Sequence, residues 1–131
     1  MIIREIQTEA TYPIRQQALY PTNDFSKVLL SDDAKGKHLG LFVQDRCVSV
    51  LSLFEKEDGI QLRKFGTLPE FQGKGYGTAL LLHALAISVG RVYLNARLEK
   101  MDFYLKFGFV ETKETFTKNG FDYCVMEKLV K

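Results

Sequence analysis

The residues with the most evident chemical use form a glycine-rich run, Gln72-Gly73-Lys74-Gly75-Tyr76-Gly77. Residues 61–68 before it are typical of a β-strand, and the apolar residues 78–89 after it are typical of a helix. Glycine lets backbone N–H groups approach a ligand closely, and the positive end of a helix dipole attracts an anion. The run is therefore suited to binding a pyrophosphate, although a tight connection without any ligand uses the same residue types.

Two other phosphate-binding motifs do not fit the spacing. A Walker loop aligned on Gly73-Lys74 would need a glycine at Leu68 and a metal-binding hydroxyl at Gly75. A dinucleotide fingerprint anchored on the same glycines would need a glycine or alanine at Thr78. It would also need an acid roughly 20 residues further on, where the chain has Asn95.

The spacing that remains is Gln-x-x-Gly-x-Gly, supplied by Gln72, Gly75 and Gly77. It resembles motif A of the Gcn5-related N-acetyltransferase (GNAT) family. A second block is similar to the family's motif B, because strand-like residues 92–97 are followed by Phe-Tyr-x-x-x-Gly-Phe at residues 103–109. The two blocks stand in the family's order. The resemblance implies acetyl-coenzyme A (acetyl-CoA) as co-substrate and no metal.

The pattern of apolar and turn residues predicts the elements that position these motifs. Strands are predicted at residues 2–6, 38–44, 47–54, 61–68, 91–96, 109–117 and 121–128, and helices at 11–18, 25–30 and 78–89, with a short helix near Phe103. The order β-α-α-β-β-β-α-β-α-β-β agrees with the α/β (α+β) acyl-CoA N-acyltransferase (GNAT) fold. We therefore expect a central mixed, mostly antiparallel sheet of about seven strands flanked by helices.

Four local details complete this prediction. The first helix is expected to begin near Thr8 or Thr11 with Pro13 in its first turn, and residues 20–24 are expected to break that helix. Gly90 is expected to cap helix 78–89 in a left-handed conformation, and Asn119-Gly120 to form a hairpin turn. Residues 31–37 are predicted to form a polar loop.

Length and composition agree with one globular domain over residues 1–131. The chain is too short for two ordinary domains, and 46% hydrophobic with 26% charged residues is typical of a globular protein. A net charge of +2 gives no support for a nucleic-acid or membrane partner. The charged start of the chain and the absence of an apolar run of ~20 residues predict a cytoplasmic location. A monomer or a homodimer is expected.

The resemblance also implies where the cofactor binds. In that family the fourth and fifth strands splay apart around the pantetheine arm, and here residues 61–68 and 92–96 correspond to them. The implied cofactor residues are Phe65, Gly66, Thr67, Gln72, Gly73, Lys74, Gly75, Tyr76, Gly77, Thr78 and Arg97. Gly66 is expected to leave room for the thioester, and Lys74 either to contact a phosphate or to remain solvated. Arg97 stands where many relatives have an asparagine.

Acetyl transfer to an amine raises two proton problems. An alkyl ammonium with a pKa near 10.4 must lose a proton before it attacks. The family often places a carboxylate on the fourth strand, which here carries Arg63 and Lys64 instead, so a water relay is expected, with Glu55 as the second choice. Tyr104 matches the tyrosine that the family uses as a donor to the leaving thiolate, although it could also simply pack against Phe103 and Phe107.

The acceptor site is the part that the sequence defines least. By the resemblance, Tyr12, Arg15, Tyr20, Phe25 and residues 116–121 are expected to line it. Arg15 could bind an acidic acceptor or could pair with Glu5 or Asp24. The acceptor itself is expected to be a small-molecule amine or a peptide terminus.

Two other functions stay open on the sequence alone. A non-catalytic acyl-CoA-binding or sensory module would keep the same cleft, and a small β-rich interaction protein would use the glycine run only as a connection. Cys47 and Cys124 are expected to be reduced thiols, and His38 and His83 to be surface or core-edge residues, because none has a partner at metal or nucleophile spacing. Asn95 is expected to satisfy a backbone group where the two strands splay apart, and Lys100 stands where a small alanine is common in the family.

Overall fold

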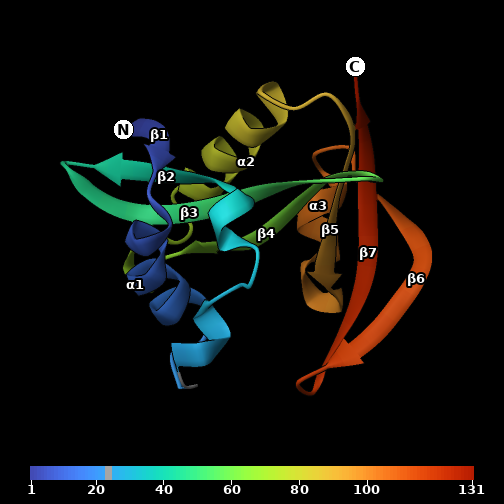
Figure 1. The fold of residues 1–131 in the computed structure, drawn as a ribbon, viewed down its shortest axis with the longest axis horizontal. Helices are drawn as coiled ribbons and strands as arrows, with labels where there is room; N and C mark the ends of the chain where they lie inside the picture. Colours follow the sequence, from blue (N-terminus) through green and yellow to red (C-terminus); the bar gives the residue numbers. More distant parts are fainter. Residues whose placement is uncertain (23–24) are drawn as a thin grey trace. The chain divides into compact units, whose positions relative to one another are not determined.

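The computed structural model describes residues 1–22 and 25–131, and it contains one seven-stranded sheet with the order β1-β2-β3-β4-β5-β7-β6 (Figure 1). The strands are β1 (Ile2–Ile6), β2 (Lys37–Val43), β3 (Arg46–Lys56), β4 (Gly59–Thr67), β5 (Gly90–Arg97), β6 (Val110–Lys118) and β7 (Phe121–Val130). The helices are α1 (Thr8–Leu19), α2 (Tyr76–Ala86) and α3 (Met101–Leu105), with 3-10 turns η1 (Phe25–Val28), η2 (Asp33–Lys35), η3 (Pro69–Phe71) and η4 (Leu98–Lys100).

The sheet is mixed and mostly antiparallel, as predicted. The pairs β1–β2, β2–β3, β5–β7 and β6–β7 are antiparallel, whereas β4 and β5 are parallel through Ile60–Leu62 and Val92–Leu94. Because α2 lies between β4 and β5 in the chain, the two strands are joined by a crossover connection, which allows them to run parallel. Contacts within the chain divide it into two compact units, residues 1–54 with 63–87 and residues 55–62 with 88–131, and each is described by itself.

In the first unit, α1 and α2 cover opposite faces of β4. A Cβ built on Gly66 would lie 2.9 Å from Ala18 Cβ of α1, whereas one built on Gly77 of α2 would lie 3.5 Å from the Phe65 ring. Successive residues of a strand point to opposite faces, so Phe65 and Gly66 face different helices. The core of this unit includes Leu39, Leu41, Val48, Val50, Leu51, Phe54, Leu80, Leu81 and Ala84, all with side chains nearly or fully buried.

The second unit is built on the antiparallel set β5–β7–β6. Asn119 and Gly120 have φ of 54° and 81° and form the two-residue turn between β6 and β7, which confirms the predicted hairpin. The register of β6 against β7 shifts between Glu111 and Thr115. At this irregularity the Thr112 hydroxyl donates to the Val125 carbonyl over 2.8 Å.

Several predicted boundaries are wrong in instructive ways. Helix α1 begins at Thr8, one of the two predicted starts, and Pro13 therefore lies beyond its first turn rather than within it. The predicted helix 25–30 is only the 3-10 turn η1, and a second such turn, η2, lies in the predicted loop. Helix α2 ends at Ala86, and Gly90 uses its φ of 88° to begin β5 rather than to cap the helix. Within the predicted break at residues 20–24, Asn23 and Asp24 lie outside the described residues.

Candidate functional site

The glycine run forms an exposed loop that leads directly into α2. Gly73 and Gly75 have φ of 76° and 85°, and a Cβ on either would meet nothing within 4 Å. The first hydrogen bond of the helix runs from the Ala79 N–H to the Gly75 carbonyl over 3.0 Å. The N–H groups of Tyr76, Gly77 and Thr78 therefore precede the first intrahelical bond and are available to an anion. This open, donor-rich loop fits the diphosphate of a coenzyme A.

Gln72 has a use that the motif alone does not reveal. Its side-chain amide Nε2 donates to the Thr67 carbonyl over 3.0 Å, so the side chain braces the start of the loop against the end of β4. Sequence reasoning assigned Gln72 to cofactor binding as part of the motif. The side-chain amide still has a second N–H and a carbonyl oxygen, so a contact of Gln72 with the cofactor remains a prediction.

The end of β4 places Phe65 and Thr67 beside the first turn of α2. A Cβ on Gly77 would lie 3.5 Å from both the Phe65 ring and Thr67 Oγ1. Gly66 faces the other way, and the space of its missing side chain is occupied by Ala18 and Leu19. The expectation that Gly66 leaves room for a thioester is therefore wrong, because this glycine is required for the close approach of α1 to the strand.

Lys74 and its surroundings form a cationic and aromatic surface next to the loop. The Lys74 ammonium lies 5.9 Å and the Arg46 guanidinium 5.2 Å from the centre of the Phe71 ring. Arg46 also lies 3.9 Å from Glu70, an exposed and long ion pair. Arg46 was not among the predicted site residues, since it precedes the loop by many residues and comes near it only because the start of β3 pairs with the chain after β4, where the Leu68 N–H donates to the Val48 carbonyl over 2.9 Å.

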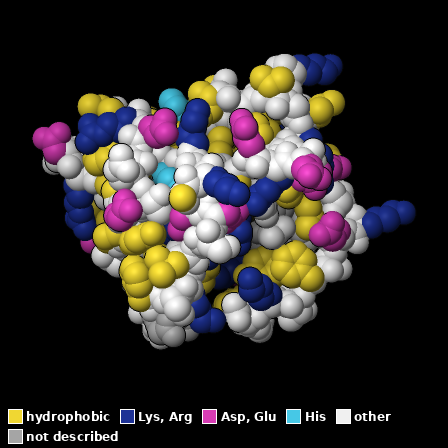
Figure 2. Space-filling view, viewed as in Figure 1, with side chains coloured by type: hydrophobic (Ala, Val, Ile, Leu, Met, Phe, Trp, Pro, Cys, Tyr) yellow, Lys and Arg dark blue, Asp and Glu magenta, His cyan; other side chains and the backbone are white. Residues whose placement is uncertain are grey.

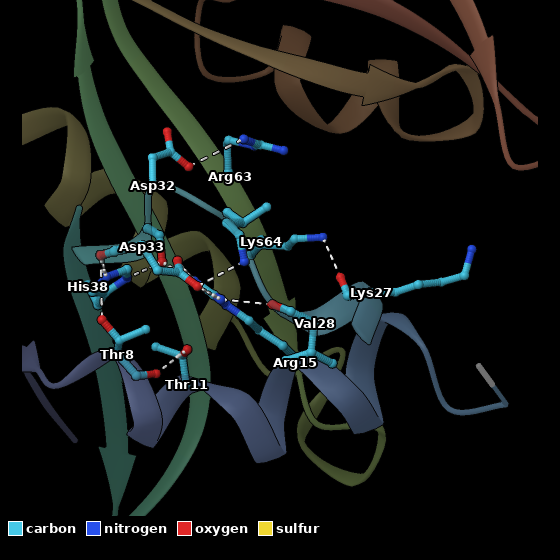
Figure 3. Close-up of polar contacts among 12 residues, drawn as sticks. Thr8, Thr11, Arg15, Lys27, Val28, Asp32, Asp33, His38, Arg63 and Lys64 are labelled. Carbon is cyan, nitrogen blue, oxygen red and sulfur yellow. Dashed lines mark hydrogen bonds and ion pairs between the residues drawn. The ribbon is translucent and has the colours of Figure 1, made fainter. Parts of the chain in front are cut away.

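Arg15 is the predicted acceptor residue that the structure places elsewhere. Its side chain is 0% exposed, and its guanidinium donates to both Asp33 carboxylate oxygens, over 2.9 and 3.0 Å (Figure 3). It also donates to the Val28 carbonyl over 2.9 Å. A guanidinium held inside the protein in this way does not reach an acceptor, so the predicted acceptor contact is wrong. Asp33 is thus the observed ion-pair partner in place of the predicted Glu5, and the other predicted partner, Asp24, lies outside the described residues.

The Arg15–Asp33 pair belongs to a buried polar network. Ser52 Oγ accepts from Arg15 over 3.0 Å and lies 2.6 Å from His38 Nδ1, while His38 Nε2 lies 2.9 Å from the Asp33 carbonyl. Burial opposes ionisation of Asp33, but the hydrogen bonds from Arg15 and the Leu30 N–H lower the pKa of this carboxyl. His38 is only 3% exposed and is a bonded core residue rather than a surface or core-edge one.

The aromatic residues predicted for the acceptor site lie in α1 (Tyr12), just after α1 (Tyr20) and in η1 (Phe25). Tyr12 and Phe25 meet edge to face with ring centres 5.6 Å apart. The Tyr20 hydroxyl accepts from the Lys64 ammonium over 2.5 Å. The same ammonium donates to the Lys27 carbonyl over 3.0 Å, as Figure 3 shows. Lys64 has a φ of 55° inside β4, which is strained for a residue with a side chain. Tyr12, Tyr20 and Phe25 remain predicted acceptor residues.

Tyr104 lies in α3 of the second unit. Its ring contacts Phe103 and Phe109, with centres 5.3 and 5.9 Å away, and its hydroxyl has no hydrogen-bond partner among the residues that the structure describes. Burial raises the pKa of Tyr104 to about 12, so the phenol keeps its proton at neutral pH. In the same unit, the Arg97 guanidinium stacks over the Phe121 ring at 4.0 Å.

Glu55, the second choice of base, lies at the exposed end of β3. It borders a surface hollow of about 490 Å³ whose lining also includes Asp58, Gly59 and Arg91. Asp58 there accepts from the Tyr93 hydroxyl over 2.9 Å and lies 3.5 Å from Arg91. These contacts are typical of a solvated ionic cluster.

Comparison with known proteins agrees with this arrangement. A sequence model of a family described as acetyltransferase (GNAT) domain matches residues 14–130. The chain belongs to the GNAT acetyltransferase family. A Brevibacillus brevis relative, named as an uncharacterized N-acetyltransferase, is 29% identical over 101 residues, which cover 69% of this chain and 64% of the relative. The chain thus spans just under two thirds of the length of that relative.

Two solved structures have the same fold. A candidate N-acetyltransferase from Lactobacillus plantarum superposes with a TM-score of 0.87 at 18% identity, with 100% of both chains covered. A GNAT family acetyltransferase from Elizabethkingia anophelis, crystallised with acetyl-CoA bound, superposes with a TM-score of 0.76 at 14% identity, covering 98% of this chain and 97% of that one. The GNAT fold assigned from the motifs is confirmed. None of the described helices has the length and apolar character needed to cross a membrane.

Proposed function

We propose that this GNAT chain is an acetyl-CoA-dependent N-acetyltransferase that acetylates the primary amine of a small molecule or a peptide terminus. The observation that carries the proposal is the loop before α2, where two left-handed glycines leave open space beside three N–H groups that no helical carbonyl engages. Such a nest of donors at a positive helix end is suited to the diphosphate of acetyl-CoA. Bound acetyl-CoA supplies an activated acetyl group as a thioester.

The residues of the loop and of β4 hold and orient this co-substrate in our proposal. The backbone of residues 73–78 binds the diphosphate, and Lys74 adds a positive charge beside it. Phe65 and Thr67 lie next to the first turn of α2 and form the wall along which the rest of the molecule extends. Arg97 is a further proposed cofactor-binding residue.

Tyr104 acts on the leaving thiolate as a hydrogen-bond donor. Its pKa of about 12 keeps the phenol protonated throughout the range in which a thiolate with a pKa near 8.5 is released. The amine attacks directly in a ternary complex, and water carries its proton away, since the strand that often supplies a carboxylate has Arg63 and Lys64 instead. Glu55 is the second candidate for that proton.

The test is calorimetric titration of CoA into three proteins: the wild type, Gly75→Ala and the control Gly120→Ala. The two glycines have φ of 85° and 81°, and a Cβ on either meets nothing within 4 Å, so the backbone cost of the two substitutions is matched. Only Gly75→Ala adds a methyl group in the open space over the loop. We expect CoA affinity to fall at least about tenfold in Gly75→Ala and to stay at the wild-type value in Gly120→Ala.

Transfer is tested separately by thiol release from acetyl-CoA in the presence of amines, polyamines, amino acids and short peptides. Release that depends on an amine supports the proposed enzyme. Tight CoA binding with no transfer to any of these acceptors would favour the non-catalytic binding module. Equal CoA affinity in Gly75→Ala and the wild type would refute the assignment of the loop.

A further inference from the structure

Ser49 is a buried polar residue of β3 that the proposed site does not include. Its side chain is 0% exposed. Its hydroxyl oxygen lies 3.2 Å from the Gly66 carbonyl oxygen and 2.8 Å from Thr67 Oγ1, so its single hydrogen can be donated to either partner. Both partners belong to the end of β4, beside the proposed cofactor wall. A buried hydroxyl with two partners on one neighbouring strand holds the backbone and a side chain of that strand together.

Thr67 contacts Ser49, Gln72 and the first turn of α2. Its carbonyl accepts from the Gln72 amide that braces the loop, over 3.0 Å. Its hydroxyl faces the first turn of α2, because a Cβ on Gly77 would lie 3.5 Å from Thr67 Oγ1. The orientation of the Thr67 hydroxyl therefore decides which polar group β4 presents beside the glycine loop.

The number of protons limits how Ser49 and Thr67 can be arranged. Each hydroxyl has one hydrogen, and the Gly66 carbonyl can only accept. If Ser49 donates to Gly66, Thr67 must donate to Ser49 and presents only lone pairs toward α2. If Ser49 donates to Thr67, the Thr67 hydrogen is released for an oxygen beside the loop. A rotation of two hydroxyl hydrogens thus changes Thr67 from an acceptor to a donor.

We propose that Ser49 is a positioning residue for acetyl-CoA, which fixes the Thr67 side chain and lets its hydroxyl donate to an oxygen of the bound co-substrate. This inference rests on the proposed function, because it uses the loop and the end of β4 as the cofactor site. Ser49 acts through Thr67 and does not itself contact the cofactor.

The structure offers a matched control on the same strand. Ser52 is also 0% exposed, and its hydroxyl bonds to Arg15 and His38. Residues three apart on a strand point to opposite faces, so Ser52 lies on the face away from Thr67. Removal of either hydroxyl costs a buried hydrogen bond, and only one of the two lies beside the proposed cofactor wall.

The experiment measures CoA affinity by calorimetry and Tm by thermal unfolding for the wild type, Ser49→Ala and Ser52→Ala. Both variants should have a lower Tm. Only Ser49→Ala should bind CoA more weakly, by about five- to tenfold, the size expected for one buried hydrogen bond. Wild-type CoA affinity in Ser49→Ala would overturn the inference. A wild type that does not bind CoA at all would overturn the proposed function and this inference with it.

A double-mutant cycle tests whether Ser49 acts through Thr67. Because its effect passes through that side chain, Ser49→Ala combined with Thr67→Val should bind CoA no more weakly than Thr67→Val alone. Additive losses would overturn the inference. If Ser49→Ala does not fold, Ser49→Cys is the alternative variant, because its side chain fills the same site and its S–H is a much weaker hydrogen-bond donor than the serine O–H. Wild-type CoA affinity in Ser49→Cys would equally overturn the inference.

Discussion

At the scale of single residues, the pKa of Tyr104 limits what this side chain can do. Complete transfer of its proton to a thiolate would run from a phenol with a pKa of about 12 to a thiol with a pKa near 8.5. A difference of about 3.5 units makes that transfer unfavourable by roughly 5 kcal/mol. A hydrogen bond from the phenol to the thiolate, in which the proton stays on the phenol oxygen, has no such cost. Tyr104 is thus better suited to stabilise the thiolate than to protonate it.

The matching prediction is that Tyr104→Phe lowers kcat by about 10- to 150-fold, which corresponds to loss of one hydrogen bond to a charged group. The ring contacts with Phe103 and Phe109 should survive, and CoA affinity should not change. Tyr93→Phe is the control, because burial and a hydrogen bond to Asp58 also raise the pKa of Tyr93 to about 12. Steady-state kinetics with any accepted amine measures both. A kcat within a few-fold of wild type in Tyr104→Phe would leave this tyrosine with a packing role.

At the scale of elements, the contact between α1 and β4 depends on a glycine. We predict that Gly66→Ala destabilises the fold by about 1–3 kcal/mol, because its Cβ would lie 2.9 Å from Ala18 Cβ and 3.3 Å from two Leu19 atoms. Gly77→Ala is the control, since its Cβ would make only ordinary contacts of 3.5 Å. Urea unfolding of both variants gives the comparison. Equal stability of Gly66→Ala and the wild type would show that α1 moves away without cost.

The buried pair Arg15–Asp33 fixes the segment between α1 and β2 and makes its stability depend on pH. The pKa of Asp33 is lowered in the folded state, so its contribution is complete above the unfolded pKa near 3.9. That contribution is lost as the pH falls from about 4 toward the lower folded pKa.

Asp33→Asn should therefore lower the free energy of unfolding at pH 7 by about 3–5 kcal/mol, since it leaves the Arg15 charge buried without a counter-charge. Below about pH 4, the free energy of unfolding of Asp33→Asn should also fall less steeply with decreasing pH than that of the wild type. Asp32→Asn is the control, because the Asp32–Arg63 pair is 3.9 Å long and partly exposed, and such pairs contribute about 0–1 kcal/mol. Chemical unfolding between pH 3 and 7 tests both variants. A similar cost for the two substitutions would contradict the role of the buried pair.

The same elements show what sequence reasoning could and could not reach. The hairpin at Asn119-Gly120 and the glycine loop were predictable, because their residue types act locally through backbone conformation. The roles of Arg15, Gly66 and Ser49 were not, because each depends on a partner from a distant segment. A buried arginine and a surface arginine look alike in one sequence. Only the contacts with Asp33, Ala18 and Thr67 distinguish a structural residue from one that faces a ligand.

At the scale of the whole molecule, charge is small and dispersed. The net charge is +2, and Figure 2 shows acidic and basic side chains interspersed over the face that it displays. Recognition of a polyanion needs a continuous basic surface. We therefore predict that labelled acetyl groups pass to small amines or peptide termini rather than to nucleic acids or folded proteins. The measurement is transfer from labelled acetyl-CoA into fractionated cell extract. Label found mainly in folded macromolecules would contradict this prediction.

The irregular strand β6 has a consequence for how copies of the molecule meet in solution. β1 and β6 are the two ends of the strand order, and an unpaired strand edge is a template on which another chain can add. β1 has only 5 residues, whereas β6 has 9. The shift of register between Glu111 and Thr115 interrupts the longer edge, and exposed charges at Lys113 and Glu114 lie within the interruption. The irregularity thus protects this edge against aggregation.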